Sequence, residues 1–208
     1  MRRFIVMFLM VALTIGGAYS QKAVEKSIDA QGIKGIAVQG DQLYRITIKT
    51  HDEKLIYATA FFEGENQNDL LLVARNDEGT ITFSINWNPA FNDPNDKLSA
   101  HKMISAGLEI IVPGNLQLDV KSDQADLIVN GQFDKVRAVL REGNCDISGM
   151  AKSADIVTVN GSISARTESS RIETHAKDGN VIRYPISKGP NSWRLKSVNG
   201  QIFIRSLK

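Results

Sequence analysis

Few residues of this chain have the types and spacing that enzymes or metal sites use. The three histidines, His51, His101 and His175, stand far apart, and no pair has the spacing of a zinc-binding motif. The single cysteine, Cys145, has no histidine near it in sequence to activate a thiolate. The chain also lacks a Gly-x-Ser-x-Gly motif and a glycine-rich phosphate loop. We therefore expect no catalytic residues, no resident metal and no cofactor.

Several aspartates in the second half of the chain are placed to project outward from strands. Two carboxylates that face each other about 5–10 Å apart would suit glycoside hydrolysis. Aspartates at strand ends more often cap turns, so a carbohydrate-active enzyme is the alternative and not the main interpretation. The residues concerned are Asp119, Asp126, Asp134, Asp146 and Asp155.

The longest segment without periodicity, residues 88–102, contains two further kinds of candidate site. Residues 92–96 concentrate oxygen ligands that suit Ca²⁺, but they lack the central glycine and closing glutamate of an EF-hand loop, so we interpret them as turns. Aromatic side chains beside this loop and beside residues 188–191 are candidates for stacking on a glycan or peptide, or for covering the core. They are Trp87, Phe91, Tyr184 and Trp193.

Short strands must position all of these residues, because no stretch of the chain has sustained helical periodicity. Apolar and polar residues alternate through residues 43–48 and 81–85, and glycine, asparagine or aspartate interrupts the pattern every 8–15 residues. This pattern predicts an all-β protein.

A phrase of three residues recurs from residue 114 onward: a glycine, a small polar or amide residue, and an apolar residue. The spacing between successive glycines ranges from 12 to 21 residues, and three copies begin with Val-Asn-Gly. The phrases begin at Gly114, Gly131, Gly143, Gly161, Gly179 and Gly200. A near-constant period of this kind predicts a short parallel β-solenoid in which each repeat is one coil. The alternative is an antiparallel β-sandwich in which each Asn-Gly is a hairpin turn.

The solenoid makes specific predictions about which residues stack. Ile163 should contact Cys145 on one side and Val181 on the other, with Ile202 beyond, and residues 201–206 should form the last strand. Cys145 occupies the apolar position of its phrase, so we expect it to be a small buried residue rather than a nucleophile. Residues 33–112 should cover the opposite end.

The first 20 residues have the features of a secretion signal peptide. Arg2 and Arg3 precede an uncharged apolar run of 12 residues, and Ala18 and Ser20 suit cleavage before Gln21. The run is too short to span a bilayer, so we expect no membrane span after cleavage. We divide the rest into an extended lead-in (21–32), an N-terminal β-rich segment (33–113) and a β-repeat region (114–208), the last two forming one continuous domain.

The charge balance argues against a nucleic-acid partner. Residues 1–20 contain two arginines and no acid, so the mature chain has 23 basic and 23 acidic residues. A nucleic-acid binder needs a basic face to neutralise phosphates. With one cysteine the chain cannot form an internal disulfide, so its stability must come from burial.

The repeats in residues 114–206, together with the β-rich segment before them, resemble the putative-adhesin family of exported bacterial proteins with β-strand repeats. This resemblance implies a right-handed β-helix and a role in adhesion, and it brings no catalytic residues. We therefore expect an exported, non-enzymatic binding or structural module in the periplasm, at the cell surface or outside the cell. Its expected partner is a glycan or an envelope protein, and the alternative remains a carbohydrate-active enzyme on the same scaffold.

Overall fold

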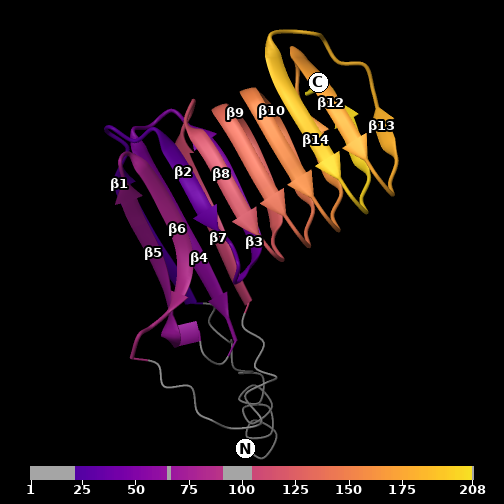
Figure 1. Ribbon diagram of the computed structural model, residues 1–208. Coiled ribbons are helices and arrows are strands. Elements are labelled where there is room, and N and C mark those ends of the chain that lie inside the picture. The colour runs from indigo at the N-terminus through magenta and orange to yellow at the C-terminus, as the bar shows by residue number, and fades with distance from the viewer. Residues whose placement is uncertain (1–21, 65–66, 91–104, 208) are drawn as a thin grey trace, which may run out of the picture.

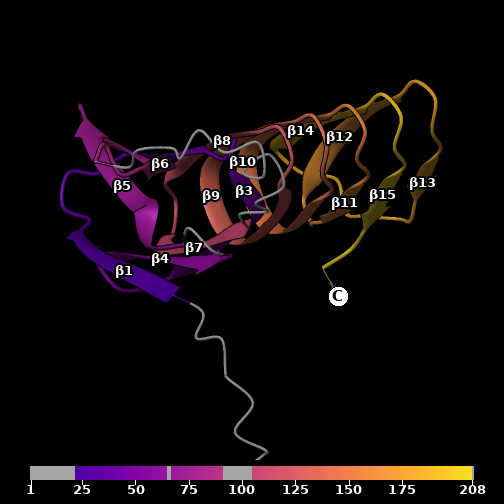
Figure 2. The same cartoon turned by 90° about the horizontal axis from the view of Figure 1, so that it is seen from below.

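A computed structural model describes residues 22–64, 67–90 and 105–207 (Figure 1). The described part is almost entirely β-structure, which confirms the all-β prediction. Its 15 strands form a single mixed sheet. The sheet folds over itself into two facing layers, and the inward side chains of both layers make one core (Figure 2).

One of the two layers is called here the first layer. Its strands, in spatial order, are β1 (Lys22–Asp29), β4 (Leu55–Glu63), β7 (Ser105–Pro113), β3 (Leu43–His51), the first part of β9 (Asp126–Leu140), the first part of β10 (Cys145–Thr158), β11 (Ile163–Arg166), β15 (Ile202–Arg205) and β13 (Val181–Arg183). Their inward residues alternate with outward ones, as in β4, where every second side chain is buried.

The facing layer, called here the second layer, carries the candidate site on its outer face. Its strands, in spatial order, are β5 (Leu70–Asp77), β6 (Thr80–Trp87), β2 (Gly35–Gln39), β8 (Gln117–Ser122), the second parts of β9 and β10, β14 (Asn191–Ser197) and β12 (Ser170–Ala176). A short 3-10 helix, η1 (Gln67–Asp69), precedes β5.

Strands β9 and β10 cross from one layer to the other, and glycines allow them to bend there. Gly131 in β9 and Gly149 in β10 have φ angles of +132° and +141°, a region that side chains disfavour. The two glycines also lie opposite each other, and a Cβ on Gly149 would collide with the carbonyl oxygen of Gly131. The bend therefore requires glycine for both conformation and space.

The prediction of a parallel solenoid is wrong, for two reasons. Three strand pairs at the N-terminal end are antiparallel in the described part of the chain: β1 with β4, β4 with β7, and β5 with β6. In addition, the strands of the last repeats do not follow one another in space, because β15 lies between β11 and β13, and β14 lies between β10 and β12. The strand Ile202–Arg205 is therefore an interior strand, and β13 is the edge strand at this end of the first layer.

The alternative of an antiparallel sandwich does not describe the second half either. The residues that follow Asn160-Gly161 pair in parallel with β10, so that Cys145 lies opposite Ile163, and they do not form a hairpin with the residues before them. Cys145 also lies opposite Leu127 on its other side and is 1% exposed, which confirms its predicted burial.

The three identical Val-Asn-Gly phrases occupy two different places in the fold. Asn160 and Asn199 lie in the same corner, where Asn199 Nδ2 donates to Asn160 Oδ1 at 2.6 Å and Asn160 Nδ2 donates to Glu142 Oε1 at 3.0 Å. Thr158 and Ser197 lie beneath them, and both hydroxyls donate to the carbonyl of Gly161. The copy at Gly131 instead forms the bend inside β9. One local phrase thus serves two tertiary roles.

Candidate functional site

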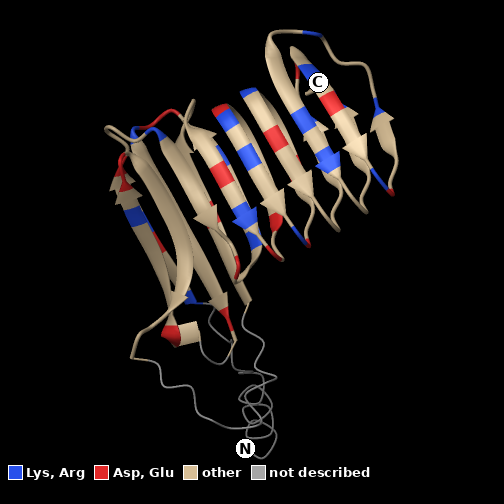
Figure 3. Cartoon of the chain, in the orientation of Figure 1, with Lys and Arg blue, Asp and Glu red and all other residues tan. Residues whose placement is uncertain are grey.

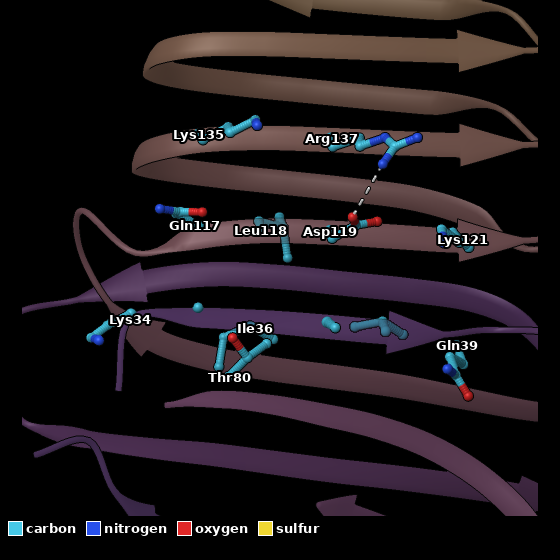
Figure 4. A pocket seen from close by; sticks show the side chains of 13 residues that line it. Lys34, Ile36, Gln39, Thr80, Gln117, Leu118, Asp119, Lys121, Lys135 and Arg137 are labelled. Carbon is cyan, nitrogen blue, oxygen red and sulfur yellow. Dashed lines mark ion pairs between the residues drawn. The ribbon is translucent and has the colours of Figure 1, made fainter. Parts of the chain in front are cut away.

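A shallow groove crosses the outer face of the second layer above β2. Its volume is about 440 Å³, and side chains from β2, β8 and β9 line it, with Thr80 at the start of β6 (Figure 4). The groove exists because β2 presents almost no side chain outward. Gly35 and Ala37 are two of its three outward residues, and a Cβ on Gly35 would lie only 3.4 Å from the backbone oxygen of Gln117.

Basic side chains dominate the walls of this groove. Lys34, Lys121, Lys135 and Arg137 line it, whereas Asp119 is the only acid among its lining residues. Arg137 Nη1 lies 3.8 Å from Asp119 Oδ2, so these two charges largely offset each other (Figure 4). Within the described part of the chain, the three lysines form no ion pair. The groove is therefore a positively charged trough whose lysines are free to contact a ligand.

Charges alternate from strand to strand along the row that contains Asp119. Each member of this row lies in register with the next: Asp119 on β8, Arg137 on β9, Asp155 on β10, Arg194 on β14 and Glu173 on β12. Arg194 Nη1 is 3.8 Å from Asp155 Oδ2. Figure 3 shows acidic and basic residues side by side on these strands. Opposite charges on neighbouring strands of this layer stabilise the register.

A second hollow lies at the far end of the layer, between β12 and residues 183–189. Its volume is about 560 Å³, and Arg171, Arg183 and Lys188 line it together with Tyr184 and Ile186. No acid is among its lining residues. Arg183 is partly engaged, since its Nη2 donates to the carbonyl of Ile172 at 2.7 Å.

Three of the four aromatic residues proposed as ligand contacts are described, and they lie in different places. Tyr184 is 59% exposed and lines the second hollow. Trp87 is 36% exposed and lines a small hollow with Tyr44, at the opposite end of the molecule. Trp193 is 1% exposed, and its Nε1 donates to the carbonyl of Ala151, so its ring belongs to the core and cannot stack on a ligand. Phe91 lies outside the described residues.

The five aspartates considered as catalytic candidates are all engaged by residues on neighbouring strands or turns. Asp119, Asp134, Asp146 and Asp155 form ion pairs with Arg137, Lys152, Arg166 and Arg194. Asp126 accepts hydrogen bonds from both nitrogens of Asn144. Their partners lie on neighbouring strands or turns, so these carboxylates join one strand to the next and do not face one another across the groove.

The remaining candidates for chemistry are dispersed or buried. Burial and the nearby Asp146 raise the pKa of the Cys145 thiol to about 12, which keeps it protonated and unreactive. Among the described residues, no group of three histidine, cysteine, aspartate or glutamate side chains could hold a metal ion. The segment 92–96, considered for Ca²⁺, and His101 lie outside the described residues, as does the proposed signal peptide. None of the helices in the described ranges is both long and apolar enough to cross a membrane.

The fold is similar to that of a solved putative cell adhesion protein. A putative cell adhesion protein from Clostridium sporogenes matches 90% of this chain and 100% of its own, with a TM-score of 0.60 and 16% identity. A putative adhesin from Bacteroides fragilis matches 89% of this chain and 98% of its own (TM-score 0.41, 11% identity). A putative lipid binding protein from Parabacteroides distasonis matches 91% and 98% (TM-score 0.30, 13% identity). No family model and no curated protein matches the chain.

The likeness to the Clostridium sporogenes protein confirms the resemblance to the putative-adhesin family, and at 16% identity it does so at the level of the fold. It identifies no ligand and no site residue.

The lysines of the groove were not predicted from the sequence. A local signal existed, because Lys135 and Arg137, like Asp119 and Lys121, stand two residues apart and therefore share one face of a strand. The sequence does not show that β8 and β9 lie side by side, or that β2 next to them presents glycine and alanine outward.

Proposed function

We propose that this protein is an exported, non-catalytic, adhesin-like binding module of the cell envelope or exterior, and that it holds an anionic ligand in the groove above β2. The observation that carries the proposal is the groove itself, which has four basic side chains against one ion-paired carboxylate. Three of those basic groups are lysines without an acidic partner in the described part of the chain. An anion is the ligand that would satisfy them.

The groove favours binding over glycan cleavage. Hydrolysis of a glycosidic bond needs two carboxylates that face the bond from opposite sides. The groove contains one, Asp119, and Arg137 engages it. We therefore assign the groove no catalytic step, and we expect a bound glycan to be released intact.

Export is part of this proposal because of the N-terminal sequence. Two arginines, an apolar run and small residues at Ala18 and Ser20 have the order of a secretion signal. The likeness of the fold to a putative cell adhesion protein agrees with a surface role. Intact mass of protein isolated from its native envelope tests this point, since a chain that retains Met1 would contradict it.

The binding test compares neutral and anionic glycans on the purified protein. We expect glycans that carry carboxylate, sulfate or phosphate to bind, neutral ones of the same length to bind at least about tenfold more weakly, and added salt to weaken the complex. Binding of neutral and anionic glycans with equal affinity would overturn the proposal.

Variants of the groove residues test whether the ligand binds in the groove. Lys121→Gln combined with Lys135→Gln should lower the affinity at least about tenfold, and Ala37→Leu should do the same by filling the floor. Lys26→Gln combined with Lys54→Gln, on β1 and the turn before β4, is the matched control and should bind as the unchanged protein does. If both double lysine variants lost affinity equally, only the overall charge of the protein would matter for binding.

A further inference from the structure

A row of residues without acids runs along the outer face of the second layer, beside the alternating charges. It begins at Gly35 in the groove and crosses five neighbouring strands in exact pairing order. This row, called here the polar row, consists of Gly35, Gln117, Lys135, Ser153, Ser192 and Arg171. All of its side chains beyond Gly35 are exposed. A ligand on the polar row would therefore lie across the strands, not along them.

The two charged side chains of the polar row are free to contact a ligand, whereas the charges of the row beside it largely offset one another. In the alternating row, Asp119 and Asp155 accompany Arg137 and Arg194. In the polar row, neither Lys135 nor Arg171 has an acidic partner within the described residues. The net charge along this line is therefore positive. Ser153 and Ser192 occupy the positions between Lys135 and Arg171, and Gln117 precedes Lys135.

The polar row joins the two hollows of this face. Its first residues, Gly35, Gln117 and Lys135, line the groove, and its last residue, Arg171, lines the hollow beside Tyr184. Neighbouring strands lie about 4.8 Å apart, so the five steps from β2 to β12 span about 24 Å. Lys34 stands at one end and Lys188 at the other, and both line a hollow.

We propose that the ligand is a linear anionic polysaccharide, which lies across the strands along the polar row from the groove to the hollow at Tyr184. This inference rests on the proposed function, since it uses the same groove. An extended sugar unit advances by about one strand spacing, so about five units would cover the row. The lysines and arginine contact its anionic groups, and the amide and hydroxyls contact its sugar hydroxyls. Tyr184, 59% exposed, offers a ring on which the terminal sugar packs.

The same residues disfavour other polyanions. A single-stranded nucleic acid uses aromatic platforms for its bases, and the polar row carries no aromatic residue. A membrane surface is flat and would meet both rows at once, including the carboxylates of Asp155 and Glu173. A single extended chain can follow the polar row, which carries two cations and no acid, without covering these carboxylates.

The test is the dependence of affinity on chain length, measured by titration calorimetry on the purified protein. The probes are oligogalacturonates as a carboxylated series, heparin oligosaccharides as a sulfated series and maltooligosaccharides as a neutral control. In at least one anionic series, the affinity should rise at least about tenfold between chains of about two units, which cover the groove, and chains of about five units, which cover the row. It should then level off.

Variants at the far end separate this inference from the proposed function. Arg171→Gln and Ser192→Glu should weaken binding of the long chains at least about fivefold and leave the short ones unchanged, whereas Lys121→Gln with Lys135→Gln should weaken both. Ser164→Glu, on the outer side of the other layer, is the matched control for an added carboxylate.

Each outcome decides one of the two claims. If short anionic chains bind in the groove but affinity does not rise with length, or if Arg171→Gln has no effect on long chains, the polar row is not the site and the proposed function stands. If neither anionic series binds, both claims fail. If long DNA oligonucleotides bind more tightly than the polysaccharides, the assignment to polysaccharide is overturned.

Discussion

Ile163 on β11 lies directly opposite Ile202 on β15, and Val181 on β13 lies on the far side of Ile202. The strand that is last in sequence is therefore enclosed by strands that precede it. Burial explains this order: Ile202 and Ile204 are 0% exposed, whereas Val181 is 42% exposed and Arg183 stands opposite Ile204. The more apolar repeat occupies the interior position, and the repeat that contains an arginine at an inward site takes the edge.

This strand order can be tested by disulfide formation on the outer face of the first layer. Ser164, Phe203 and Ile182 lie side by side on β11, β15 and β13. In a Cys145→Val background, Ser164→Cys with Phe203→Cys should form a disulfide on oxidation, because neighbouring strands bring Cα atoms about 5 Å apart. Ser164→Cys with Ile182→Cys should not, since they are two strands apart. Mass spectrometry after alkylation distinguishes the two, and the reverse result would contradict the order.

Stacked corners make Gly161 sensitive to any side chain. A Cβ at this position would collide with the carbonyl oxygen of Gly143 in the corner below. Gly161→Ala should therefore lower the free energy of unfolding by at least about 3 kcal/mol. Denaturant titration provides the measurement.

Gly32→Ala is the matched control for that substitution. Gly32 has a φ of +78°, but no atom lies within 4 Å of the position of its Cβ. The cost there should be about 1 kcal/mol, from backbone strain alone. Similar costs at both glycines would mean that the corners do not stack closely.

Cys145 makes the stability of the protein depend on pH above neutrality. Burial raises the pKa of its thiol to about 12, while an unfolded chain has a thiol pKa of about 8.5. Below pH 8.5 the thiol is protonated in both states; as the pH rises from there to about 12, only the unfolded state ionises, so the folded state loses stability. At pH 11 the loss should approach about 3 kcal/mol.

Cys145→Val isolates this contribution from those of other titrating groups. The variant should keep the fold, and its unfolding free energy should fall less between pH 8 and pH 11 than that of the unchanged protein, by about 3 kcal/mol. Thiol reagents should label the native protein only as fast as it unfolds. An identical pH dependence in both proteins, or rapid labelling, would show that Cys145 is accessible to solvent.

Arg183 protects an open edge of the sheet. β12 pairs only with β14, and the guanidinium of Arg183 donates to the carbonyl of Ile172 on that edge strand at 2.7 Å. Arg183→Ala should uncover this acceptor beside the exposed Val181 and Ile182, and so promote strand addition between copies. Sedimentation velocity should show concentration-dependent association for this variant. Arg205→Ala, on an interior strand, is the control and should sediment as the unchanged protein does.

Asp155 lies between two arginines and partly neutralises their positive charge. It is in register with Arg137 on one side and Arg194 on the other. Because all three side chains are substantially exposed, Asp155→Asn should change the unfolding free energy by less than about 1 kcal/mol. It should nevertheless raise the affinity for an anionic glycan several-fold. Asp52→Asn, in the turn between β3 and β4, removes the same charge at a distance and should leave the affinity unchanged.

The sequence by itself determined the all-β class, the burial of Cys145 and the turns at the glycine phrases other than the one at Gly131. These follow from local chemistry: alternation of apolar and polar residues selects strands, and glycine with asparagine selects turns. Arg183 stands opposite the buried Ile204, and the strand that contains it lies at the edge.

Only the tertiary structure decided the order of the strands and the surface they create. Identical Val-Asn-Gly phrases form a corner at Gly161 and a bend inside β9 at Gly131, because neighbouring strands and not the phrase itself set the direction of the chain. The antiparallel strands at the N-terminal end likewise depend on long-range pairing. The groove, the alternating charges and the polar row all join residues from different repeats. Their chemistry is a property of the register between strands, which alternation within one strand does not specify.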